Sequence, residues 1–180
     1  ALFAKSPTQF LPQVRIRLSA YEGMGESRNL VEVRIFEGNL FDNLDNITNH
    51  LAALYGKRIV IESMERREES LLPMVAFREG LLNAMVHRDY SVHRSFLNIV
   101  NTDNLQIINY GGLMDGITVD SLRKEHLSVL RNPDMANICY LGHYIEVAGS
   151  GTLRILDECD KIPGMTVAWT ELSGVLALTF

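Results

Sequence analysis

The sequence has few cysteines, no long apolar run and no excess of basic residues. Its 180 residues include only Cys139 and Cys159, which excludes a disulfide framework, and neither has a partner at zinc-ligand spacing. No apolar run approaches the roughly 18 residues that a membrane helix needs. The 17 basic and 22 acidic residues give a net charge of -5, which disfavours a protein whose main task is to grip a nucleic-acid backbone. We therefore expect a cytoplasmic protein with reduced thiols and no membrane contact.

Hydrophobic periodicity predicts an α+β fold. In 14–21 the apolar residues alternate, and in the next strand Val31, Val33 and Ile35 alternate with polar positions, so the two strands are expected to pair. Strands paired in hairpins, with helices gathered on one side, favour a two-layer sandwich with a mixed, mostly antiparallel sheet. The expected strands are 14–21, 31–36, 58–62, 95–101, 105–109, 167–170 and 175–180; the expected helices are 39–56, 73–87, 119–126, 134–141 and 152–161; and 65–70 is expected to be a solvated loop.

The helix predicted from Pro73 carries polar residues at intervals of four. Glu79, Asn83 and His87 share one face of this helix, apart from its apolar stripe. A carboxylate can accept a proton from an attacking water, and an amide oxygen is a ligand that magnesium prefers. Polar residues at this spacing are more often only the solvated side of a helix, so the pattern needs support from elsewhere in the chain.

Two glycine-containing segments supply candidates for that support. Asn109 ends a predicted strand before Gly111-Gly112, where the backbone can turn closely over a ligand, and its amide oxygen can accept from an adenine amino group. Gly149-Ser150-Gly151-Thr152 precedes a helix, and exposed N–H groups at a helix start suit a phosphate. A plain tight turn and a plain helix cap are the alternative interpretations.

A metal site is a weaker alternative for the residues that follow the helix. His87, Asp89 and His93 are three potential zinc ligands within one turn, but no second cluster accompanies them. The simpler interpretation is that His87 ends the helix, where its partial charge is favourable. The two cysteines are expected in the core.

Phe77 to Ser91 resembles the signature of a bacterial family of RecG-related transcriptional regulators. In that family a schlafen-type AlbA domain is followed by a HATPase-like domain. Three later segments match in the same order: 108–113; 128–133, which contains Arg131-Asn132-Pro133; and 149–155. By this resemblance, residues 1–20 are the end of the upstream AlbA-like domain or a linker, residues 21–180 form the HATPase-like domain, and the chain is part of a longer protein.

The resemblance implies a Bergerat (GHKL) fold, similar to the ATPases of gyrase B and histidine kinases, and it implies roles for the candidate residues. Glu79 falls on the general base and Asn83 on the Mg²⁺ ligand, with His87 beside them. Asn109, Gly111 and Gly112 fall on the adenine loop, and Gly149, Gly151 and Thr152 on the phosphate loop.

The sequence departs from the superfamily at two positions of the adenine loop. Asn109 stands where Asp is usual, and Leu113 stands where a second glycine is expected. The segment between the two glycine loops is also short for a full ATP lid, so nucleotide binding is better supported than hydrolysis.

Two hypotheses of different classes remain. In the first, the domain binds ATP and Mg²⁺, and hydrolyses ATP slowly, within a DNA-associated regulator whose upstream domain contacts the DNA. In the second, it is a degenerate relative without nucleotide chemistry that serves as a dimerisation or protein-interaction platform. A homodimer is compatible with both.

Overall fold

The computed structural model of the chain describes residues 2–23, 27–55, 57–62, 65–70, 72–92, 97–145 and 150–180; for 57–62 and 65–70 it describes the backbone alone. The strands are β1 (Ile16–Glu22), β2 (Asn29–Phe36), β3 (Lys57–Glu62), β4 (Glu65–Ser70), β5 (Leu97–Asn101), β6 (Leu105–Tyr110), β7 (Ala168–Leu172) and β8 (Val175–Thr179). The helices are α1 (Leu40–Tyr55), α2 (Met74–Val86), α3 (Pro133–Leu141) and α4 (Gly151–Asp160), with short 3-10 turns η1 (Pro7–Gln9), η2 (Pro12–Val14) and η4 (Ser121–Arg123).

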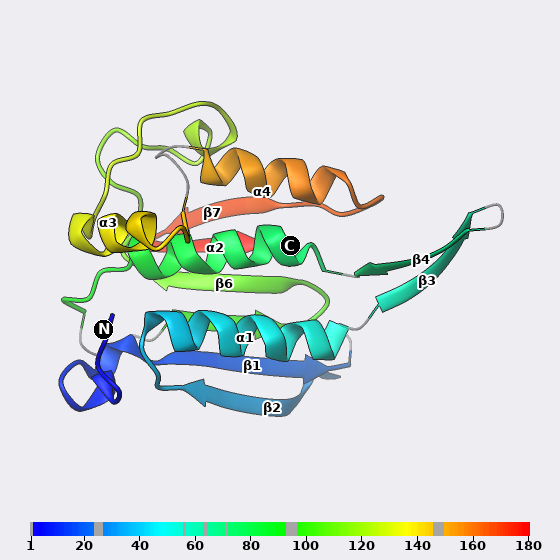
Figure 1. Ribbon diagram of the computed structural model, residues 1–180, viewed down its shortest axis with the longest axis horizontal. Helices are drawn as coiled ribbons and strands as arrows, with labels where there is room; N and C mark the ends of the chain where they lie inside the picture. The colour runs from blue at the N-terminus through cyan, green and yellow to red at the C-terminus, as the bar shows by residue number, and fades with distance from the viewer. Residues whose placement is uncertain are drawn as a thin grey trace.

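One mixed sheet forms the base of the molecule. Its strand order is β2-β1-β5-β6-β8-β7, and neighbouring strands are antiparallel except β1 and β5, which run parallel. Figure 1 shows α1, α2 and α4 in front of this sheet, and α2 contacts both of the other helices. The predicted α+β architecture, with a mostly antiparallel sheet and helices on one face, is confirmed at this level.

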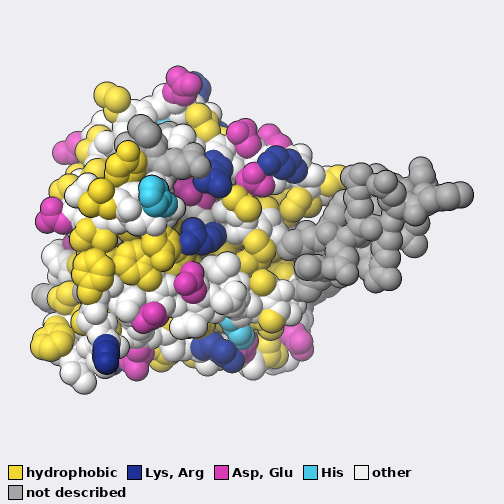
Figure 2. All heavy atoms as spheres, viewed as in Figure 1, with side chains coloured by type: hydrophobic (Ala, Val, Ile, Leu, Met, Phe, Trp, Pro, Cys, Tyr) yellow, Lys and Arg dark blue, Asp and Glu magenta, His cyan; other side chains and the backbone are white. Residues whose placement is uncertain are grey.

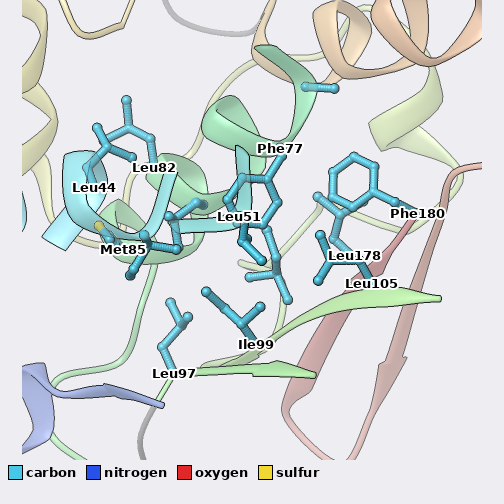
Figure 3. Close-up of a cluster of buried hydrophobic side chains, with 14 of the residues drawn as sticks. Leu44, Leu51, Phe77, Leu82, Met85, Leu97, Ile99, Leu105, Leu178 and Phe180 are labelled. Carbon is cyan, nitrogen blue, oxygen red and sulfur yellow. The ribbon is translucent and has the colours of Figure 1, made fainter. Parts of the chain in front are cut away.

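The core lies between α2 and a row of side chains that stand in register across the sheet. Leu18, Ile99, Ile107 and Leu178 are paired in turn from β1 to β8, and all four are buried. Phe77 of α2 is fully buried and points down into this layer (Figure 3). The alternation of side chains across a sheet places each of these residues on the helix-covered face.

The far face of β2 is open. Phe36 pairs with Ile16 and is buried toward the helices, so Val31, Val33 and Ile35 face the other way. Each of these three side chains is about half exposed (53%, 45% and 51%). The apolar side that the sequence pattern identified is therefore the outer side of this edge strand.

Helix α1 begins with a side-chain cap and buries one stripe. The Asn39 Oδ1 accepts a hydrogen bond from the backbone N–H of Asp42 at 3.0 Å, which satisfies one of the unpaired donors of the first turn. Its leucine and isoleucine residues recur at three- and four-residue spacing, and they are buried except Leu54, which is 47% exposed. The predicted helix 39–56 is thus confirmed as α1.

Two local predictions were wrong. Residues 65–70 form the strand β4, which pairs antiparallel with β3, and the resulting hairpin reaches away from the body in Figure 1. The helix predicted over 119–126 is only the 3-10 turn η4, because the chain becomes extended at Lys124 (φ -135°, ψ 167°).

The expected boundary at residue 20 falls inside a strand of the main sheet. Strand β1 pairs with both β2 and β5, so residues 16–20 are part of the same sheet as the rest of the chain. Among the helices that the structure describes, none is long and apolar enough to cross a membrane.

Candidate functional site

The polar face of α2 opens into a cleft. Asn83 Nδ2 donates to Glu79 Oε1 at 3.3 Å, so the two side chains are in contact one helical turn apart. His87 is the C-cap residue of α2, and its N–H bonds to the Asn83 carbonyl. Asn83 and His87 line both adjoining lobes of the cleft, whereas Glu79 lines only one of them. The shared face predicted from the i, i+4 spacing is therefore present.

The first turn of α4 lies against this pair. A Cβ added to Gly151 would stand 2.4 Å from Glu79 Oε1, closer than real Cβ atoms approach, and 3.1 Å from Asn83 Nδ2. A side chain at this position would therefore displace the Glu79 carboxylate. Gly149 lies outside the described residues.

Thr152 follows Gly151 in α4 and lines the same lobe of the cleft as Asn109. Its Oγ1 is buried and has no hydrogen-bond partner among the residues that the structure describes. Ser150, at the N-cap position, makes no side-chain cap to the helix. The N–H groups of the first turn of α4 and the positive end of the helix dipole adjoin Glu79 and Asn83.

Asn109 forms the floor of the cleft at the end of β6. It is only 3% exposed, and its Oδ1 has no partner within the described part of the chain. Leaving a buried acceptor without a partner costs about 1–3 kcal/mol. A lining residue with an unpartnered polar atom is typical of a site for a hydrogen-bonding ligand.

The two glycines after Asn109 pack against the chain itself. Gly111 has φ +100°, and a Cβ there would lie 2.9 Å from both the backbone N and the Cβ of Asp89. A Cβ on Gly112 would lie 2.1 Å from Glu171 Oε1. Both glycines line the cleft; the conformation and neighbours of Gly111 explain its lack of a side chain, whereas a side chain at Gly112 would displace the Glu171 carboxylate.

The lobe above Asn109 is largely apolar. Gly80, Ile107, Ile155, Trp169 and Leu178 are among its walls, and its empty volume, including the open mouth, is about 940 Å³. A Cβ on Gly80 would lie 2.4 Å from Leu178 Cδ2, so this glycine allows close packing of α2 on the sheet. Mostly apolar walls with a few polar groups are typical of small-molecule sites.

Arg131 and Asn132 hold the cleft in shape, which the sequence did not indicate. Arg131 Nη2 donates to the Gly112 carbonyl at 2.8 Å. Asn132 Nδ2 donates to the carbonyls of Val86 and Arg88 at 2.7 and 2.8 Å, at and just after the end of α2. These partners are 19, 44 and 46 residues away in the chain. The Arg131-Asn132-Pro133 motif was visible in the sequence, but the motif alone does not indicate which residues its side chains contact.

The basic groups of the cleft influence one another. Burial, followed by the charges of Arg131 and His126, lowers the pKa of His87 below its ordinary value of 6.5. Both of these neighbours line the same lobe as His87. Figure 2 shows acidic and basic side chains interspersed on this face of the molecule.

Hydrogen bonds of Asp89 hold the residues after α2 in place. The Asp89 N–H donates to the Tyr110 carbonyl at 3.0 Å, and its Oδ1 accepts from the Ser91 N–H and hydroxyl. The bonds from Ser91 lower the pKa of the Asp89 carboxyl. No group of three potential metal ligands occurs among the described residues, and His93 of the alternative zinc set lies outside them.

The two cysteines lie in the core, as expected. Both are buried and free, and burial raises the pKa of Cys139 and that of Cys159, the latter to about 11.

Comparison with known proteins supports an ATPase-like domain. Residues 99–180, which run from within β5 through β6, α3, α4 and the last hairpin, match a family model described as "Putative ATP-dependent DNA helicase recG C-terminal". No curated protein sequence matches the chain.

The fold is also similar to that of a solved protein. The crystal structure of the DIP2311 protein from Corynebacterium diphtheriae superposes with a TM-score of 0.82 over 94% of this chain, at 20% sequence identity. The chain spans 35% of the length of that protein. The C-terminal part of this chain is thus similar in sequence to an ATPase-like domain family, and nearly all of it shares its fold with a larger protein.

Proposed function

We propose that the cleft between α2, α4 and the end of β6 binds ATP with Mg²⁺, as a Bergerat-type nucleotide domain. The observation that carries the proposal is the contact of Gly151 with Glu79 and Asn83, in the cleft whose floor holds the unpartnered Asn109 oxygen. These residues come from three distant segments of the chain. Their convergence supports a ligand that has both a base and phosphates.

The lining residues fit such a ligand in chemistry and position. Asn109 Oδ1 accepts a hydrogen bond from the exocyclic amino group of the base, which gives this buried atom the partner it lacks. The apolar walls beside it, Ile107 and Ile155, pack on the faces of the base. The first turn of α4, with the Thr152 hydroxyl, holds the phosphates through its N–H groups and dipole.

Asn83 and Glu79 divide the remaining tasks. The Asn83 amide donates through its nitrogen to Glu79, which directs its oxygen away from the carboxylate and makes it available to the metal. Bound Mg²⁺ neutralises charge on the phosphate oxygens. Glu79 accepts a proton at its carboxylate from the attacking water in slow hydrolysis.

The wider role is also a proposal. We place this domain in a bacterial, cytoplasmic transcriptional regulator of the RecG-related type, in which an upstream AlbA-like (schlafen-type) domain contacts DNA. The net charge of -5 supports the assignment of DNA contact to another domain.

The test measures Mg²⁺-dependent binding of a non-hydrolysable ATP analogue by the protein and by Asn83→Ala. We expect Asn83→Ala to lose at least tenfold in affinity, chiefly in the presence of Mg²⁺. Asn46→Ala, which removes an exposed asparagine from α1, is the matched control and is expected to bind like the parent. Equal binding by Asn83→Ala would contradict the metal assignment.

Hydrolysis is tested separately with Glu79→Gln. This variant is expected to bind the analogue but to lose turnover at least a hundredfold, the usual contribution of a general base. Unchanged turnover would contradict the role of Glu79.

A further inference from the structure

The amide of Asn109 sits where the proposed nucleotide presents the edge of its base. Asn109 is 3% exposed, its Oδ1 is without a partner among the described residues, and it lines the apolar lobe of the cleft. The inference that follows rests on the proposed function and concerns which bases the cleft accepts.

Another buried asparagine, Asn43, has an amide whose orientation is fixed by hydrogen bonds to the protein. Asn43, also 3% exposed, accepts from the Gly38 N–H at 2.9 Å and donates to the Gly38 carbonyl at 3.0 Å. Reversing that amide would break both bonds, so its orientation is determined by the fold. The oxygen of Asn109 has no comparable bond that would hold it in place.

An amide that the fold does not orient can present either of its ends. A carboxamide carries an acceptor oxygen and a donor NH₂, whereas a carboxylate at the same position can only accept. A 6-amino purine offers a donor at position 6, and a 6-oxo purine offers an acceptor there. Rotation of the Asn109 amide by half a turn therefore matches the second base as well as the first.

The surroundings of Asn109 do not oppose an acceptor on the base. Among the described residues that line this lobe, Arg131 is the cation, and none is an aspartate or glutamate. Arg131 Nε is itself buried without a partner in the described part of the chain, beside Gly111. A carbonyl on the base would thus meet an unpaired donor, Arg131 Nε, and the neighbouring carboxylate of Asp89 is itself paired with Arg131 at 3.9 Å.

We propose that Asn109 makes the cleft tolerant of both 6-amino and 6-oxo purine nucleotides. The residue selects for a purine edge with a polar group at position 6, not for adenine alone. Replacement by aspartate would convert the site to one that prefers the 6-amino base.

The experiment compares the affinities of ATP, inosine triphosphate and purine riboside triphosphate, each with Mg²⁺, under conditions without turnover. Inosine triphosphate carries the 6-oxo group without the 2-amino group of guanine, so steric rejection of the latter does not enter. We expect ATP and inosine triphosphate to bind within tenfold of each other. Purine riboside triphosphate, which has no group at position 6, is expected to bind about tenfold more weakly than ATP.

Asn109→Asp supplies the protein-side test. We expect it to weaken inosine triphosphate at least tenfold relative to ATP, because a carboxylate faces the 6-oxo group with a second acceptor. Asn104→Asp adds the same charge in the exposed turn between β5 and β6 and is expected to leave the ratio unchanged.

Because the wild-type comparison uses only ligands, it decides the matter even if Asn109→Asp does not fold. A preference of the wild-type protein for ATP of more than tenfold over inosine triphosphate would overturn the inference and leave the proposed function intact. Failure of all three nucleotides to bind would overturn the proposed function itself.

Discussion

The side chain of Asn132 is expected to stabilise the whole fold by tying α3 to the end of α2. Its Nδ2 donates to the carbonyls of Val86 and Arg88, which lie at a helix terminus where backbone acceptors lack partners within the helix. Asn132 is also the N-cap residue of α3, but its side chain makes no cap bond there. Asn132→Ala therefore removes the contact with α2 without removing a cap from α3.

The magnitude follows from the two bonds. A hydrogen bond contributes about 0.5–1.5 kcal/mol net, so the loss of both is expected to lower the free energy of unfolding by about 1–3 kcal/mol. Bonds that span 44 and 46 residues belong to the native state alone, so this loss is not offset by local structure in the unfolded chain.

Urea denaturation followed by the fluorescence of Trp169 measures this change. Trp169 is the single tryptophan and is 7% exposed in β7, so it reports unfolding of the sheet. Asn137→Ala, at an exposed position of α3, is the matched control and is expected to change stability by less than about 0.5 kcal/mol. An Asn132→Ala variant as stable as this control would refute the role assigned to Asn132.

Two further predictions concern α2. Gly80→Ala should lower stability by about 1 kcal/mol, because overpacking against Leu178 costs about 1–3 kcal/mol and exceeds the roughly 1 kcal/mol gain in helix propensity; a variant more stable than the parent in urea would contradict the close packing. His87 has a folded-state pKa below 6.5, so the unfolded chain takes up its proton first as the pH falls. The free energy of unfolding should therefore decline as the pH drops below about 6.5, and His87→Gln should remove part of that decline. Urea denaturation of both proteins at pH 7.5 and pH 5.5 measures how much each loses between the two pH values. Equal losses would exclude the contribution of His87.

The helices and the main hairpins could be predicted because their signals are local. Leu40, Leu44, Ile47 and Leu51 recur at helical spacing and are the buried stripe of α1. Thr102-Asp103-Asn104 is a turn signal between two apolar runs, and β5 and β6 pair across it. In both cases the periodicity and the turn residues lie within the element that they predict.

The wrong local predictions have tertiary causes. Strand β4 (Glu65–Ser70) is rich in charged residues and has no alternation of apolar side chains, so its pairing with β3 was not visible in the sequence. The segment after η4 is extended, and it leads to Arg131 and Asn132, whose contacts lie in the glycine loop and at the end of α2. Within 119–126 itself, Arg123 Nη2 donates to the Val167 carbonyl, a partner 44 residues away that the local pattern does not reveal.

The shared helix face of the candidate site could be predicted, but the contacts around it could not. Spacing placed Glu79 and Asn83 on one face of α2, yet only the fold brings Gly151 against them. The requirement for glycine at position 111 comes from its positive φ and from Asp89, two features that a motif cannot display.

The central claim is that a nucleotide binds in the cleft beside Gly151. Calorimetric titration with a non-hydrolysable ATP analogue and Mg²⁺ measures this for the wild-type protein and for Gly151→Val, whose added side chain collides with Glu79. We predict saturable binding by the wild-type protein and a loss of at least tenfold, about 1.4 kcal/mol, in a Gly151→Val variant that still unfolds cooperatively. No wild-type binding up to about millimolar analogue, or equal binding by a folded Gly151→Val, would contradict the proposed nucleotide site.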